Sequence, residues 1–220
     1  MILLALLTYQ LLFPITTLKS VNGEKEIQRI KINNSIVTNR IAGFLLFGIV
    51  AFYIDWLRSF QSINNFFSLE IPWLWLFAIG ISILLAVNIL VVNRKSIKHY
   101  PQLQFQNWNW KSHSLNAITW TVYLFSYEWL WRGVLLQELL LLLNPVFTIL
   151  VNVTCYALLH LFKSKEEALA SIPFGIALCV VGILTHSFLI PFLLHIILAL
   201  SFEYGCIKQL QSQHLKNISL

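Results

Sequence analysis

The sequence predicts an all-α, multi-pass helical membrane protein with about seven transmembrane helices. The chain has 220 residues, of which 58% are hydrophobic and only 11% are charged, and its mean hydropathy is +0.73. Soluble domains carry roughly 25% charged residues, so a chain this apolar has to contact lipid along several spans. The composition excludes an ordinary soluble domain and a disordered chain. A disulfide scaffold is also excluded, because the three cysteines are odd in number and lie mostly in apolar runs.

Seven apolar stretches are candidate spans. In chain order they cover residues 1–18, 41–57, 71–93, 115–143, 146–162, 172–184 and 188–204. The third and fourth exceed the roughly 20 residues that a helix needs to cross the hydrocarbon core, and the sixth is the shortest. We expect one membrane domain with three parts: amino-terminal helices and basic loops at 1–113, a motif-bearing helical core at 114–204, and a cytosolic tail at 205–220.

The positive charges alternate between the predicted loops. Of the fifteen Lys and Arg residues, thirteen fall in the loops 19–40 and 94–113, after Phe162 and in the tail, whereas Arg58 is alone on the opposite side and Arg132 lies in a span. Because cytoplasmic loops collect positive charge, this pattern predicts a cytosolic carboxyl terminus, in the plasma membrane if the protein is bacterial. The orientation explains the net charge of +6. No nucleic-acid partner is expected, since no recognition motif accompanies the charges.

The fourth span contains two ionisable residues, Glu128 and Arg132, four positions apart. A charge at mid-bilayer costs about 2.5 to 3.5 kcal/mol and usually faces the bundle interior with a partner. Residues four apart share a helical face, so we expect an ion pair, with Gly133 leaving room for a neighbouring helix. The pair alone fits a structural role as well as a functional one. Asp55, at the end of the second span, is expected to be a solvated residue at the membrane interface.

The fourth and fifth spans are joined by an Asn-Pro dipeptide at 144–145, which predicts a sharp turn and an antiparallel hairpin. Positions equally far from the turn then face each other, so Glu128 lies opposite His160 and Arg132 opposite Tyr156. At 1.5 Å per residue, both pairs lie about 24 Å below the turn, nearer the cytosolic leaflet. The hairpin therefore predicts two polar pairs at one depth.

The last span adds His195, about 12 Å below its outer end. Because the predicted sixth span is too short to cross the core, we expect the turn at 185–187 to lie about 10 Å below the outer surface. This would bring His195 to the depth of Glu128 and His160, beside a cavity that satisfies the backbone of the buried turn. A carboxylate and two imidazoles could activate water or bind a hydrolytic metal, although each histidine could equally be a packing residue.

Three short motifs thus follow one another on the fourth, fifth and last spans. They read Tyr127-Glu128-x-x-x-Arg132, Tyr156-x-x-x-His160 and His195-x-x-x-Ala199. Their order and spacing resemble E-E-x-x-x-R, F-x-x-x-H and H-x-x-x-N/D of the CPBP family of intramembrane proteases, which includes the CAAX prenyl endopeptidase and bacteriocin-related relatives. The resemblance covers roughly residues 114–204. Two positions depart from the family: Tyr127 stands where the family has its first glutamate, and Ala199 where it has Asn or Asp.

The resemblance implies an intramembrane endopeptidase, a hydrolase that cleaves a membrane-associated or lipidated peptide with activated water. The residues implied for catalysis are Glu128, His160 and His195, with Arg132 as a structural partner and Tyr127 and Tyr156 lining the site. A glutamate-type mechanism requires no metal, and zinc held by the three catalytic candidates is the alternative.

The two departures from the family motifs are also compatible with a second function, from another class of protein. A catalytically inactive membrane protein could keep the CPBP fold and act as an immunity factor, a scaffold or a peptide binder. Expected partners are the lipid bilayer, a peptide or lipidated protein substrate, and another membrane protein. A transporter is disfavoured, because the chain has no internal repeat.

Overall fold

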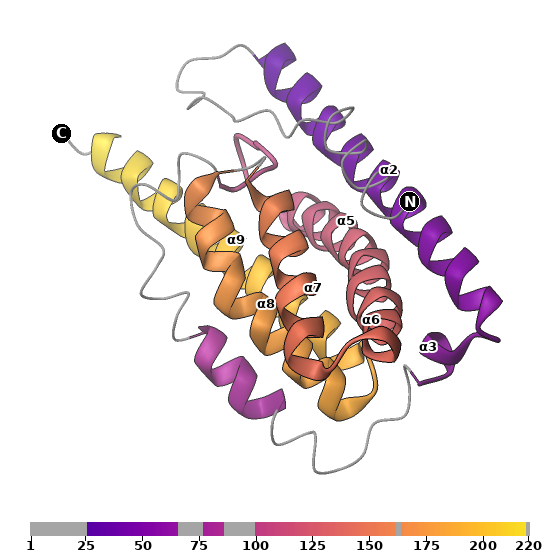
Figure 1. Cartoon of the computed structure of the whole chain (residues 1–220). Coiled ribbons are helices and arrows are strands. Elements are labelled where there is room, and N and C mark those ends of the chain that lie inside the picture. Colours follow the sequence, from indigo (N-terminus) through magenta and orange to yellow (C-terminus); the bar gives the residue numbers. More distant parts are fainter. Residues whose placement is uncertain (1–25, 66–76, 86–99, 162–163, 219–220) are drawn as a thin grey trace.

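The computed structural model describes residues 26–65, 77–85, 100–161 and 164–218, and every regular element among them is a helix. The named elements (Figure 1) are α2 Glu26–Leu57, α3 Gln61–Asn64, α5 Trp110–Glu128, the π-helix η3 Trp129–Leu135, α6 Leu136–Leu142, α7 Pro145–His160, α8 Lys165–Thr185 and α9 Leu189–Ile218. Residues 77–85 form a further helical segment within the predicted third span. The predicted first span and the remainder of the third lie outside the described residues. The all-α fold is confirmed.

Polar side chains determine where α7 and α8 begin. Asn144 accepts a hydrogen bond from the backbone N–H of Phe147 (3.1 Å), and Pro145 occupies the first helical position of α7. Proline suits that position because its missing N–H would have no partner there. Ser164 accepts from the backbone N–H of Glu167 (3.0 Å) and starts α8. The predicted sharp turn at 144–145 is therefore formed by helix capping.

Helix α2 begins at Glu26, well before the predicted start at residue 41. The prediction of a loop at 19–40 is wrong for residues 26–40, because hydropathy marks the part of a helix that contacts lipid and not its full length. No Gly or Pro interrupts residues 26–42. In the same way, α9 continues to Ile218 through most of the predicted tail.

Helix α8 has 21 residues, a rise of about 31 Å, and the prediction of a short sixth span at 172–184 is wrong. The first turn of α8 is charged, with Lys165, Glu166 and Glu167, and hydropathy therefore omits it. The helix is long enough to cross a membrane. A short sixth helix therefore does not lower the turn that follows it, contrary to the prediction.

In the turn between α8 and α9, Thr185 and Ser187 are buried and His186 between them is exposed, and the polar groups of the turn bond to one another. Thr185 Oγ1 donates to the carbonyl of Ser187 (3.1 Å), and the N–H of Leu189 donates to Ser187 Oγ (3.2 Å). His186 reverses the chain with a φ of 50°, in the left-handed region. Side-chain hydrogen bonds thus replace water around this backbone.

Helices α5, η3 and α6 form one continuous helical run from Trp110 to Leu142, in place of the predicted span 115–143. The π-helical part, Trp129–Leu135, contains Arg132 and follows directly on Glu128. A π-helix is wider than an α-helix and often occurs at functional sites. The irregular segment therefore coincides with the first sequence motif.

The core lies where α2, α5, η3 and α7 meet (Figure 1). Its buried apolar members are Phe47, Ala51, Tyr127, Leu130, Trp131, Val134, Tyr156 and Leu159. Helix α7 packs against α8, and α9 packs against α5 and α8. These contacts bring the three motif-bearing helices together.

Apolar side chains also cover much of the outside. Ile49, Leu142, Val146 and Leu150 are more than half exposed. Three helical stretches in the described part of the chain are long and apolar enough to cross a membrane, namely Ile30–Leu57, Lys165–Thr185 and Leu189–Gln213. Exposed apolar surface on long apolar helices is typical of lipid contact, so the chain is an integral membrane protein.

Candidate functional site

The centre of the site is the ion pair between Glu128 and Arg132. Arg132 Nη1 lies 3.3 Å from each carboxylate oxygen of Glu128, and both side chains are 0% exposed. Glu128 is the last residue of α5 and Arg132 lies in the π-helical turn that follows. The pair expected from the spacing is present. Gly133 makes room for side chains and not for a helix backbone, because a Cβ there would lie 3.0 Å from Phe188 and Trp129.

His195 reaches this pair from α9. Its Nδ1 lies 2.5 Å from Glu128 Oε1. An ionised carboxylate can only accept hydrogen bonds, so Nδ1 carries the proton and Nε2 is the basic nitrogen of the ring. The structure therefore joins the predicted acid to one of the two predicted imidazoles.

Tyr156 connects the pair to the second motif. The Arg132 guanidinium carbon lies 4.5 Å from the centre of the Tyr156 ring, a cation–π contact. The facing of Arg132 and Tyr156 across the hairpin is thus confirmed. The ring is accommodated by Gly175 of α8, where a Cβ would lie 3.1 Å from Tyr156 Cδ1. Tyr127 also borders the site, with its ring centre 6.0 Å from that of His195.

His160 contacts the site through Tyr156. Its Nδ1 lies 2.9 Å from the Tyr156 carbonyl oxygen, and the two ring centres are 4.5 Å apart. The ring centre of Tyr156 is also 6.5 Å from that of His195. His195 therefore contacts the Glu128 carboxylate directly, and His160 borders the same aromatic cluster.

The residues suggested as zinc ligands do not form a metal site in this arrangement. Among the described residues, no group of three or more His, Cys, Asp and Glu side chains is placed to hold a metal ion. Glu128 already uses its carboxylate on Arg132 and His195. The donor set that zinc would need is thus not gathered.

A second buried polar cluster, missed by the sequence analysis, surrounds Glu203 of α9. Glu203 Oε1 accepts from the backbone N–H of Gln102 and from Trp120 Nε1, both at 3.2 Å, and lies 3.8 Å from Arg40 Nη2. Arg40 also donates to Gln102 Oε1 (3.0 Å). The sequence predicts residue 40 at the end of a cytosolic loop, whereas Arg40 lies within α2 and is buried; a helix extended toward Glu26 would have placed it there. Ala199, one turn before Glu203, packs in an apolar cluster and adds no polar group.

The segment 100–105 forms a strap across this end of the bundle. The N–H of Gln104 donates to Asn33 Oδ1 (2.6 Å), Tyr100 Oη donates to Glu167 (3.1 Å), and Leu103 is buried. Burial raises the pKa of the Tyr100 phenol well above its usual value, and the charges of Glu167 and Glu203 raise it further. The strap is therefore held by α2, α8 and α9.

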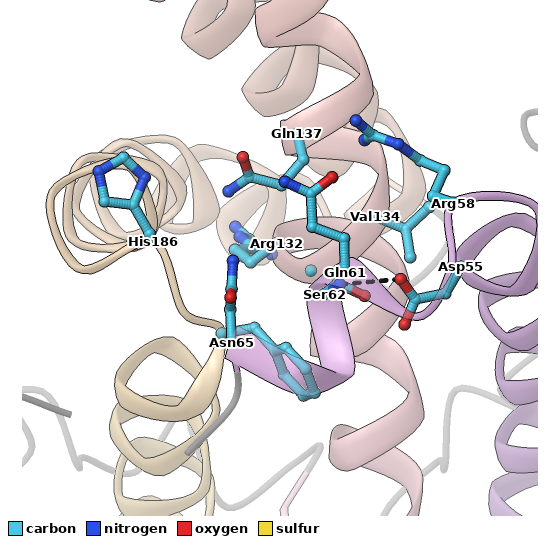
Figure 2. A pocket seen from close by; sticks show the side chains of 11 residues that line it. Asp55, Arg58, Gln61, Ser62, Asn65, Arg132, Val134, Gln137 and His186 are labelled. Carbon is cyan, nitrogen blue, oxygen red and sulfur yellow. Dashed lines mark hydrogen bonds between the residues drawn. The ribbon is translucent and has the colours of Figure 1, made fainter. Parts of the chain in front are cut away.

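A polar pocket opens on another side of Arg132, between α3, η3 and the turn from α8 to α9 (Figure 2). Asp55 lies in its wall and is 1% exposed, so the expectation that Asp55 is solvated is wrong. Its carboxylate accepts from the N–H of Ser62 (2.8 Å) and of Ile63 (3.1 Å), and from Trp129 Nε1 (3.3 Å). These bonds replace the water that an interfacial carboxylate would bind.

Comparison with known proteins identifies the segment that carries the motifs. The family model described as "Type II CAAX prenyl endopeptidase Rce1-like" matches residues 104–201. This stretch includes all three motifs, and the match confirms the resemblance read from them. No curated protein and no solved structure gives a significant match.

Proposed function

We propose, from the match of residues 104–201 to the model of the Rce1-like type II CAAX prenyl endopeptidases, that this protein is an intramembrane endopeptidase. It would hydrolyse a peptide bond in a membrane-associated or lipidated peptide. The observation that carries the proposal is the contact between His195 and a buried, Arg-paired Glu128. A carboxylate bound to an imidazole is the arrangement with which many hydrolases activate a nucleophile.

The base that meets water is proposed to be His195. Both Glu128 oxygens lie next to Arg132 or His195 and the side chain is 0% exposed, whereas the His195 side chain is 12% exposed. In this mechanism Glu128 orients His195 and offsets the charge of its protonated ring. His195 Nε2 takes a proton from water, the hydroxide oxygen attacks the peptide carbonyl carbon, and the same nitrogen returns the proton to the departing amine.

The remaining residues have supporting roles in this proposal. Arg132 neutralises Glu128 and fixes its position. His160, whose Nδ1 donates to the Tyr156 carbonyl, is assigned to the developing oxyanion, as the family resemblance implies; it would act as an imidazolium, whose Nε2–H donates to that oxygen. Tyr127 and Tyr156 form aromatic walls near His195. None of these steps needs a metal ion.

The substrate is proposed to be a peptide near the carboxyl end of a lipidated protein. The description of the matched family supports this class, and exposed apolar side chains on the long helices would place the site where a lipid-anchored peptide can reach it. We further propose that the carboxyl terminus is cytosolic and, if the protein is bacterial, that it lies in the plasma membrane. The substrate would then arrive at the end of the bundle that the strap crosses.

The second candidate function is a catalytically inactive CPBP-fold protein that binds a peptide or another membrane protein. The observation in its favour is that the two departing positions are packing positions. Tyr127 lies among Phe47, Tyr123 and Trp131, and Ala199 lies in an apolar cluster. Binding without turnover would distinguish this function from hydrolysis.

The decisive experiment offers quenched peptides, with and without a prenyl group, to the purified protein in detergent. We expect turnover by the parent chain and at least a hundredfold loss in Glu128→Gln and His195→Ala, with a smaller loss in His160→Ala. Glu166→Gln is the matched control, because Glu166 is an exposed carboxylate in the first turn of α8 and does not line the site. Equal turnover in all variants would overturn the enzymatic proposal, and tight binding without turnover in the parent would support the second candidate.

A further inference from the structure

The pocket beside Arg132 has a polar lining that no catalytic role explains. Figure 2 shows Arg132 between His186 and the side chains of Gln61 and Asn65, with Gln137 close by. These residues come from four different elements, so the pocket is a product of the tertiary fold. Its innermost space is about 10 Å³, which is the size of roughly one water molecule. A peptide cannot enter such a space.

Arg132 has donors left over after it binds Glu128. Nη1 is directed to the carboxylate, but Nε and Nη2 have no hydrogen-bond partner among the described residues, although the side chain is fully buried. Buried charged donors without an acceptor are strongly disfavoured and rare in folded proteins. The Tyr156 ring against the guanidinium and the nearby Cys179 thiol are weak acceptors, so a stronger acceptor such as an oxygen atom is favoured at this position.

The other charged groups of the pocket wall are engaged elsewhere. The Asp55 carboxylate is bound by Ser62, Ile63 and Trp129, and Arg58 forms an ion pair with Glu138 at 2.9 Å. An additional anion would bring charge into a site whose cation is already paired with a carboxylate. Water is small and neutral and can both accept and donate hydrogen bonds, so it fits the space and the vacant donors.

We propose that this pocket is a hydration site, in which bound water accepts from Arg132 and exchanges with solvent near the α2–α3 and α8–α9 turns. The water completes the hydrogen bonding of Arg132, and Arg132 in turn positions Glu128 against His195. The hydration itself is independent of catalysis. Its consequence for peptide hydrolysis rests on the proposed function.

Hydroxyl-radical footprinting of the full-length protein by X-ray radiolysis tests the site, because radicals formed from bound water oxidise the side chains next to it. Phe188 and Phe47 are both 1% exposed, but only Phe188 lines the pocket, and Phe47 lies in the apolar core. We expect Phe188 to be oxidised at least fivefold faster than Phe47. Equal rates would overturn the proposal.

A pair of variants at Asn65 controls for indirect effects. Asn65→Trp should fill the pocket and reduce the oxidation of Phe188 to the level of Phe47, whereas Asn65→Ala removes the same side chain and leaves the pocket open. Unchanged oxidation in Asn65→Trp would mean that the water lies elsewhere and would also overturn the proposal. If Phe188 is oxidised as expected but the parent chain hydrolyses no peptide, the hydration site stands and the proposed function fails.

Discussion

His195 and Glu128 lie 67 positions apart in the sequence, and their side chains meet at 2.5 Å inside the helical bundle. The contact joins the end of α5 to the first half of α9, which pack against each other. Because Arg132 lies on the same carboxylate, one buried acid is shared by a guanidinium and an imidazole. Removing Arg132 and removing His195 should therefore destabilise the protein to different extents.

Arg132→Leu should reduce the amount of folded protein in the membrane more than His195→Ala does. Loss of Arg132 leaves a buried carboxylate without its cation, which costs about 3–5 kcal/mol, whereas loss of His195 removes one hydrogen bond to a charged group, about 1.5–3 kcal/mol. Quantitative blotting of membrane fractions measures the difference. Similar amounts of both variants would contradict the structural importance of the ion pair.

Arg40 and Glu203 should be coupled energetically, because they lie 3.8 Å apart and share Gln102 as a partner. We expect the loss of stability in the double variant Arg40→Met, Glu203→Leu to be smaller than the sum of the single losses, by about 0.5–3 kcal/mol. Thermal unfolding in detergent provides the four values of the cycle. Strict additivity would show that the cluster does not act as a unit.

Stability should fall at alkaline pH partly through Tyr100. Its pKa in the folded protein is raised above the usual value of about 10, so the protonated phenol stabilises the fold below pH 10 and this contribution is lost as the pH rises further. The unfolding temperature of the parent should thus drop more between pH 9 and pH 11 than that of Tyr100→Phe, which lacks the titrating group. Parallel pH profiles would rule out this contribution.

The proposed orientation predicts opposite labelling of two exposed positions. Gln211→Cys, near the end of α9, should react with a membrane-impermeant maleimide only from the cytosolic side, and Gln61→Cys in α3 only from the other side. Sealed vesicles of both orientations provide the measurement. The parent chain is the background control, because its cysteines are buried or half-buried. Labelling of Gln211→Cys from outside would reverse the topology.

The sequence predicted the site better than it predicted the helices. The i, i+4 spacing of Glu128 and Arg132 and the short turn at 144–145 are local features, and two of the three pairings predicted from them, Glu128 with Arg132 and Arg132 with Tyr156, are present. The third, Glu128 with His160, stays a prediction. The helix boundaries were less accurate. Hydropathy follows lipid contact, so it omitted the polar first half of α2 and the charged first turn of α8.

The amino-acid sequence by itself determined the membrane environment, the helical fold and the set of residues available for chemistry, because apolar composition and residue spacing act locally along the chain. Only the tertiary structure decided which groups meet. It placed His195 on Glu128, buried Arg40 beside Glu203, and left Arg132 at the wall of a small polar pocket. These outcomes depend on how helices distant in the sequence pack, and the period of a single helix does not specify the depth or rotation of its neighbours.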